Sequence, residues 1–118
     1  MHELSLAQSI CDTVLSYARA DQKIVTVVVE CGPLSGVVPE SLSYCFTIVA
    51  PMVGLGEAKL DLRLLRAEGV CPACGRKIDV KSMWDGCPAC GHAPITVAGG
   101  REFRIKEIEV VDRPAAAP

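Results

Sequence analysis

Two five-residue segments of this 118-residue chain are identical, and each contributes two cysteines. They are Cys71-Pro-Ala-Cys74-Gly75 and Cys87-Pro-Ala-Cys90-Gly91. Both sulfurs of such a segment come from one tight turn, and the glycine that follows lets the chain reverse with a positive φ. The N–H groups of the turn point at the thiolates and offset their charge. Two such turns supply four sulfurs tetrahedrally, the arrangement that a structural zinc ion prefers.

Iron is the first alternative to zinc at these four cysteines. Iron also accepts four sulfurs, and the Cys-Pro-x-Cys-Gly turn resembles the turns of rubredoxin. The loop between the two cysteine pairs is much shorter here than in rubredoxin, which favours zinc. Two disulfides or four free thiols are the other alternative, which the regular spacing disfavours. A four-thiolate site is closed to water and substrate, so a catalytic zinc is not expected.

The composition excludes several classes of function. Half of the residues are hydrophobic, which indicates a globular chain, and the net charge of −2 argues against a nucleic-acid partner, which needs a basic face. The amino terminus lacks the basic start of a signal peptide, and no apolar run is long enough to span a bilayer. We therefore expect a cytoplasmic protein that does not bind membranes. The chain carries no nucleophile elbow, phosphate loop or HExxH motif, so we expect no enzyme.

Hydrophobic periodicity predicts two helices and three strands around the cysteine segment. The expected elements are a helix over 4–20, a strand over 24–31, a helix over 39–50, a strand over 57–67 and a strand over 101–111. Ser5 and Gln8 have the spacing of a capping box, and Pro51 is expected to stop the second helix. The apolar positions of the last strand change parity, which predicts a β-bulge or twist near Lys106–Glu107.

These elements predict an α+β fold, a three-stranded sheet covered on one face by two helices, with an inserted rubredoxin-like zinc-ribbon lobe. We expect residues 1–68 and 98–112 to form the α+β domain and residues 69–97 to form the zinc ribbon. The tail over 113–118 is expected to be disordered. The ribbon is too small for a core of its own, so metal binding should supply most of its stability.

His2 is the second candidate metal ligand. A histidine at position 2 brings together the α-amine of Met1, the amide of His2 and the imidazole Nδ1. With Glu3 or a further amide, a square-planar, nitrogen-rich site results, which suits Ni(II) or Cu(II). The plain alternative is that His2 is a solvated terminal residue and that Glu3 only compensates a helix dipole.

The remaining candidates have ordinary interpretations as well. His92 can contact a thiolate or can be an exposed residue of the turn. Cys11, Cys31 and Cys45 are interpreted as small buried hydrophobes rather than a second metal or redox site. The side chains expected to balance the charge of a four-thiolate centre are Arg76, Lys77 and Lys81. Trp84 is expected to pack over the small core of the ribbon.

Several segments together resemble one family. They are Met1-His2-Glu3-Leu4-Ser5-Leu6-Ala7, Gly32-Pro33-Leu34-Ser35-Gly36-Val37, Pro39-Glu40-Ser41-Leu42 with Phe46, the four cysteines at positions 71, 74, 87 and 90, and Gly99-Gly100-Arg101-Glu102-Phe103-Arg104-Ile105-Lys106-Glu107-Ile108-Glu109-Val110. In this order they are similar to the nickel metallochaperones of hydrogenase maturation, the HypA/HybF family. The resemblance covers the chain apart from its Ala/Pro tail.

The resemblance implies a function. Members of the family bind Ni(II) at the amino terminus through the residues matching His2 and often Glu3, and hold a structural zinc in the ribbon. They work with the GTPase HypB to load the large subunit of [NiFe] hydrogenase, and some members serve urease maturation proteins. Some members carry histidines beside both cysteine pairs, whereas this chain has only His92, beside the second pair, and none beside the first. We expect a nickel carrier that is a monomer or a weak homodimer.

Two other functions stay open at this point. A zinc-ribbon module that binds protein or nucleic acid without transporting metal would need only the four cysteines. A rubredoxin-like electron carrier would need iron in place of zinc. The Met1-His2-Glu3 start and the absence of a basic face favour the carrier.

Overall fold

The computed structural model describes residues 2–82 and 85–112, which form two compact units. The first unit contains the described residues up to Val29, Val37–Leu62 and the residues from Ile105 on. The second contains Glu30–Gly36 and Arg63–Arg104. Trp84 and the tail over 113–118 lie outside the described residues.

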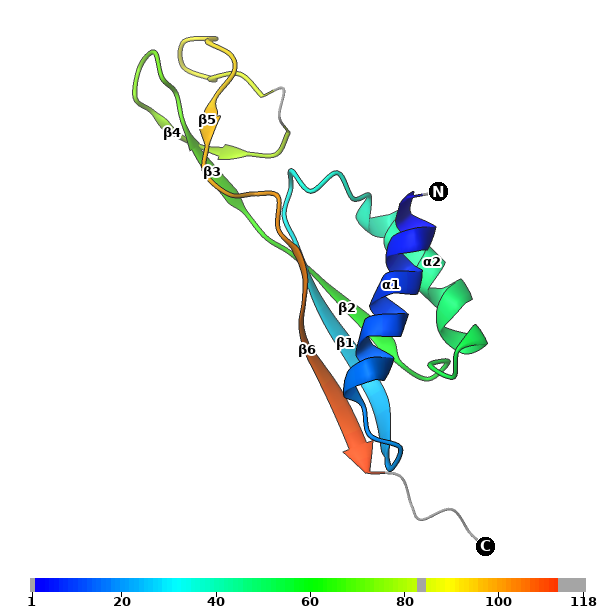
Figure 1. Ribbon diagram of the computed structural model, residues 1–118. Coiled ribbons are helices and arrows are strands. Elements are labelled where there is room, and N and C mark those ends of the chain that lie inside the picture. Colours follow the sequence, from blue (N-terminus) through cyan, green and yellow to red (C-terminus); the bar gives the residue numbers. More distant parts are fainter. Residues whose placement is uncertain (1, 83–84, 113–118) are drawn as a thin grey trace, which may run out of the picture. The chain divides into compact units, whose positions relative to one another are not determined.

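The fold is α+β, with two helices and two small sheets (Figure 1). The elements are α1 (His2–Tyr17), β1 (Gln22–Cys31), α2 (Pro39–Met52), β2 (Lys59–Leu64), β3 (Ala67–Val70), β4 (Lys77–Val80), β5 (Thr96–Val97) and β6 (Phe103–Asp112). One sheet has the order β2-β1-β6 and the other has the order β4-β3-β5. The predicted three-stranded sheet with two helices and an inserted lobe is confirmed.

The helices pack against each other and cover one face of the first sheet within the first unit (Figure 1). Strand β1 is central in this sheet, as its unbroken run of β-branched residues predicts. The buried side chains come from all three elements: Ala7, Ile10, Cys11 and Val14 from α1, Ile24, Val27, Val28 and Val29 from β1, and Leu42, Phe46, Val49 and Ala50 from α2. This apolar layer holds the start of α1 and the start of α2 in one folded unit.

Helix α1 begins earlier than predicted. It runs from His2 to Tyr17, so the Ser5 and Gln8 capping box is wrong because Ser5 already lies inside the first turns. The helix also ends three residues before position 20. The Gln22 N–H donates to the Arg19 carbonyl in the turn that leads into β1.

Helix α2 begins at Pro39, as predicted, with Val38 as its N-cap. Proline suits a first helical position because its missing N–H would have no partner there and its φ is already helical. Pro51 does not stop the helix, which continues to Met52. The N–H groups of Val53 and Leu55 both donate to the Ala50 carbonyl and close this end.

The strand predicted over 57–67 is two strands, because β2 ends at Leu64 and β3 begins at Ala67. At the break, the Leu65 N–H donates to the Cys31 carbonyl at 2.8 Å. The parity change in β6 is present: Phe103 and Ile105 are half-buried, the side chains at Lys106 and Glu107 are exposed, and Ile108 is half-buried again. Phe103, Ile105, Ile108 and Val110 are therefore all half-buried despite the change of parity, whereas Val111 is exposed.

The second unit contains the 69–97 segment expected for the ribbon together with flanking residues, since it comprises Glu30–Gly36 and Arg63–Arg104. The Gly32 N–H donates to the Glu102 carbonyl at 2.7 Å, and the Leu34 N–H donates to the Gly100 carbonyl at 2.6 Å. A Cβ on Gly32 would overlap the Gly100 carbonyl oxygen, so this close approach requires glycine. In the described ranges, 2–82 and 85–112, no helix is both long and apolar enough to cross a bilayer.

Replacing Leu42 by alanine should destabilise the first unit by about 2–5 kcal/mol, because Leu42 is fully buried and its loss leaves a cavity. The matched control is Leu15→Ala, at a helical leucine that is 40% exposed. This change should cost about 1 kcal/mol or less. Urea unfolding followed by circular dichroism measures both, and equal losses would contradict the packing described.

Candidate metal centre

The four cysteines of the repeated segments come together in the second unit. Cys71 directly follows β3, Cys74 lies in the turn before β4, and Cys87 and Cys90 lie in the turn before β5. All four sulfurs lie within 4.8 Å of one another, with Cys71 Sγ 3.5 Å from Cys90 Sγ and Cys74 Sγ 3.6 Å from Cys87 Sγ. Zinc–sulfur bonds of about 2.3 Å place the sulfurs of a tetrahedron about 3.8 Å apart. The cluster is therefore consistent with a zinc ribbon.

Disulfides do not account for these cysteines. All seven cysteines of the chain are free thiols. The two short sulfur–sulfur distances within the cluster are far longer than the roughly 2.05 Å of a disulfide bond. The arrangement instead offers four separate sulfur ligands to one ion.

The first turn wraps its own backbone around the Cys71 sulfur. The N–H groups of Cys74 and Ala73 donate to Cys71 Sγ, and the Arg76 N–H donates to Cys74 Sγ. Gly75 takes a φ of 77° and its N–H donates to the Cys71 carbonyl at 2.8 Å. The glycine therefore makes the reversal possible, as the sequence predicts.

The second turn repeats this geometry. The N–H groups of Cys90 and Ala89 donate to Cys87 Sγ, and the His92 N–H donates to Cys90 Sγ. Gly91 has a φ of 76°, and its N–H donates to the Cys87 carbonyl at 2.8 Å. Identical sequence gives identical local geometry because every one of these contacts lies within a few residues.

The thiols differ in acidity. Hydrogen bonds from the N–H groups of Cys90 and Ala89 lower the pKa of Cys87 to about 6, although burial opposes this. Burial would raise the pKa of Cys71, but N–H donors from Cys74 and Ala73 outweigh it and lower that pKa.

The pKa values of the other two thiols, Cys74 and Cys90, are raised. The His92 N–H would lower the pKa of Cys90, yet the neighbouring Cys71 and Cys87 sulfurs, together with burial, raise it to about 12. The Arg76 N–H acts on Cys74 in the same way and is likewise outweighed by sulfur neighbours, so that pKa is raised. Two of the four protons therefore resist leaving until a cation balances the sulfur charge.

A small apolar cluster surrounds the sulfurs. Cys71, Val80, Cys87 and Ile95 are buried, and Leu34, Ile78 and Val97 pack against them. A Cβ on Gly69 would lie 2.6 Å from Ile95 Cγ2 and 2.7 Å from Val80 Cγ2, so only glycine fits in β3 at this point. This core is too small to hold the unit by burial alone, which leaves a large share of the stability to metal binding.

The other sequence candidates lie outside the four-sulfur cluster. His92 is exposed and contributes its backbone N–H to the turn. Cys11 and Cys31 are buried and Cys45 is half-buried, which agrees with their interpretation as small hydrophobes. Burial raises the pKa of Cys11, so this thiol is not activated. Side chains at Arg76, Lys77 and Lys81 are exposed.

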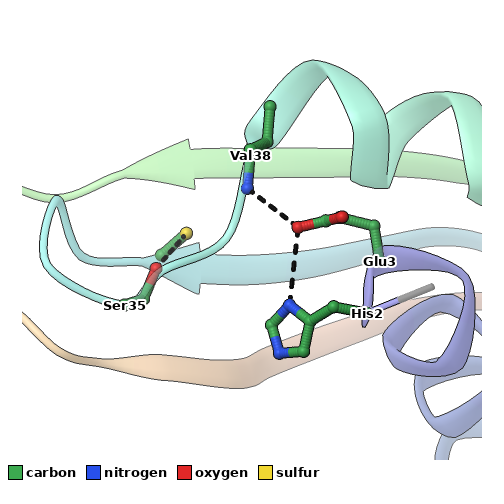
Figure 2. Close-up of polar contacts among 5 residues, drawn as sticks. His2, Glu3, Ser35 and Val38 are labelled. Atoms are coloured by element: carbon green, nitrogen blue, oxygen red, sulfur yellow. Dashed lines mark hydrogen bonds and ion pairs between the residues drawn. The ribbon is translucent and has the colours of Figure 1, made fainter.

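The amino-terminal candidates sit together on the first turn of α1 (Figure 2). The His2 side chain is 61% exposed and its Nδ1 lies 3.4 Å from Glu3 Oε2. The same oxygen accepts a hydrogen bond from the Val38 N–H at 3.3 Å. This bond is the main reason that the pKa of Glu3 is lowered, with His2 adding to the effect. Met1, the third candidate ligand, lies outside the described residues.

The contact of the Val38 N–H with Glu3 is not predictable from the sequence. The contact joins residues 35 positions apart, and no local sequence motif predicts it. The only available signal was Pro39, which marks a helix start whose free N–H groups attract carboxylates. The α2 N-terminus has no side-chain cap from Val38 itself, and Glu3 of the other helix supplies the acceptor.

The fold and the cysteine cluster define an α+β protein with a zinc-ribbon metal site. A family model described as "Hydrogenase/urease nickel incorporation, metallochaperone, hypA" matches residues 1–110. The chain belongs to this HypA family.

Relatives in the same family are similar along their full length. The chain is 39% identical over 110 residues to the hydrogenase maturation factor HypA of Geobacter sp. (strain M21), covering 93% of this chain and 99% of the relative. It is 38% identical over 112 residues to HypA of Albidiferax ferrireducens, with the same coverage. The solution structure of the Ni metallochaperone HypA from Helicobacter pylori has the same fold, with a TM-score of 0.58, 22% identity and coverage of 94% of this chain and 98% of that chain.

Replacing Cys74 by serine should remove bound metal, because one of four sulfur ligands is lost while the side chain keeps its shape. We expect purified protein to carry about one metal ion per chain, and the variant to carry well under half of that. Cys45→Ser is the control and should keep the full content. Plasma mass spectrometry measures both, and a Cys74→Ser variant with full metal content would contradict the site.

Metal binding to the metal-free protein should release at least about two protons at pH 7, because the raised pKa values keep the Cys74 and Cys90 thiols protonated until the ion binds. The apparent affinity should accordingly fall as the pH falls. Calorimetric titration with zinc in buffers of different ionisation enthalpy counts these protons. Release of none would contradict the assignment of thiol ligands.

Proposed function

We propose that this chain is a nickel carrier that binds Ni(II) at its amino terminus and delivers it for maturation of [NiFe] hydrogenase. The observation that carries this proposal is the pair His2 and Glu3, which stand together and partly exposed on the first turn of α1. The matched family, described by nickel incorporation into hydrogenase and urease, supports the same conclusion.

The ligands that we propose for nickel are the α-amine of Met1, the backbone amide and Nδ1 of His2, and Glu3. The amine, the amide nitrogen and Nδ1 close adjoining chelate rings around one ion, and nitrogen ligands in a plane suit Ni(II). Zinc prefers the tetrahedral sulfur cluster, so Cys71, Cys74, Cys87 and Cys90 are proposed to hold a structural zinc. The coordination geometry of each site would therefore direct nickel to the amino terminus and zinc to the four cysteines.

This arrangement suits a protein that must give its metal away. A closed four-thiolate site exchanges poorly, whereas an exposed terminal chelate can be reached by a receiving protein. Ligand nitrogens must lose protons to bind the metal, so nickel should bind more tightly as the pH rises and should leave when they are protonated. We propose no catalytic role for the chain itself.

The proposed partners follow from the family. They are the GTPase HypB and the large subunit of [NiFe] hydrogenase, with urease maturation proteins as a further group. The protein would act in the cytoplasm, as a monomer or weak homodimer. We assign nickel to the 1–68 and 98–112 domain and zinc to the 69–97 segment. An interaction module that carries only zinc would not account for the pairing of His2 with Glu3 at the amino terminus.

Replacing His2 by alanine should weaken nickel binding by at least about tenfold, because the imidazole nitrogen and its chelate ring are lost. The control is His92→Ala, which changes an exposed histidine next to the cysteine turn and should leave nickel affinity within about twofold. Competition titration with a coloured chelator, on protein with a native amino terminus, measures both. Unchanged affinity in the His2→Ala variant would refute the proposed nickel site.

A further inference from the structure

The Glu3 carboxylate links the nickel terminus to the start of α2 (Figure 2). One oxygen atom, Oε2, lies 3.3 Å from the Val38 nitrogen and 3.4 Å from His2 Nδ1. The Glu3 side chain is only 20% exposed, whereas that of His2 is 61% exposed. The carboxylate is thus held from the α2 side, and the imidazole is the more exposed partner of the pair.

The contact between His2 and Glu3 uses Nδ1, the imidazole nitrogen that a terminal chelate would also need. The His2 amide nitrogen and Nδ1 are joined through the short side chain and can close a six-membered ring around a metal. Nε2 lies on the far side of the imidazole and cannot join that ring. Next to a carboxylate, Nδ1 carries the hydrogen, because a carboxylate oxygen can only accept. A hydrogen bond from Nδ1 to Glu3 Oε2 and a metal bound at Nδ1 therefore exclude each other.

We propose that the Val38 N–H is a positioning group for nickel capture: it holds the Glu3 carboxylate against His2 Nδ1 as a latch that metal binding must open. This inference rests on the proposed function. It adds Val38, the N-cap residue of α2, as a group that tunes the same site. It gives the carrier a built-in means of weakening its hold on nickel, since the latched form competes with the loaded form. Reclosing of the latch would then favour release.

The backbone at Val38 allows a direct test. Val38 has a φ of −90° and a ψ of 109°, so a proline at this position needs a change of about 25° in φ, and the extended ψ suits a residue that precedes Pro39. Val38→Pro removes the N–H and leaves Glu3 and His2 in place. Val38→Ala removes the two valine methyl groups but keeps the N–H, so it controls for the loss of valine side-chain contacts.

The first readout is the metal-free protein, in which nitrogen-15 NMR of the imidazole shows which ring nitrogen carries the hydrogen above the histidine pKa. His92→Ala identifies the His2 signals. We expect wild type and Val38→Ala to favour hydrogen on Nδ1, and Val38→Pro to lose that preference. Identical spectra for the two Val38 variants would overturn the latch, whatever the nickel site is.

The second readout is nickel affinity. Val38→Pro should bind Ni(II) about two- to fivefold more tightly than Val38→Ala, because the competing contact is gone. In a Glu3→Ala background, the two Val38 variants should bind equally. Equal or weaker binding by Val38→Pro in the Glu3 background would overturn the inference, even where His2→Ala abolishes nickel binding. If His2→Ala changes nothing, the proposed function fails instead, while the NMR comparison still tests the contact.

A third measurement covers a Val38→Pro variant that does not fold. Hydrogen exchange of the Val38 amide in metal-free wild type should be slower, about several-fold, than in Glu3→Ala, because the carboxylate no longer accepts that hydrogen. Equal exchange rates would overturn the proposal.

Discussion

The second unit depends on keeping four sulfurs close together. Each sulfur needs negative charge to bind a metal, yet the raised pKa values of Cys74 and Cys90 show how strongly neighbouring sulfurs resist that charge. The turns supply backbone N–H donors, which lower the pKa of Cys71 and Cys87, but these donors do not suffice for all four. A bound divalent cation would supply the rest. The apolar cluster at this site has four buried residues, and two of them are Cys71 and Cys87 themselves, so it contributes little burial of its own.

Under the proposed function, the two candidate sites would bind different metals. The cysteine cluster is built from short-range contacts, closed by its own turns, and suited to an ion that stays. The His2 and Glu3 pair stands on the first turn of a helix, where side chains are accessible and the neighbouring backbone can take part in binding. A carrier gains from this separation, because the structural ion is not disturbed when the transported ion is exchanged.

Local signals in the sequence predicted much of the fold. The β-branched run of β1 identified the central strand, Pro39 identified the start of α2, and the repeated turns identified the cluster. The errors have both local and tertiary causes. At Pro51 the cause is local: α2 runs one residue further, to Met52, and ends where the N–H groups of Val53 and Leu55 both donate to the Ala50 carbonyl. The strand expected over 57–67 breaks because Leu65 pairs with Cys31, far away in sequence.

By itself, the sequence identified the four cysteines and the local geometry of their two turns, because each turn closes within six residues. The pairing of β3 with both β4 and β5 brings the two turns together. The sequence also named His2 and Glu3 as candidate members of a terminal chelate, without any partner from the rest of the chain. Tertiary structure decided what surrounds them. The Val38 N–H reaches Glu3 only because α1 and α2 pack side by side over β1, and no spacing along the chain encodes a hydrogen bond between residues 35 positions apart.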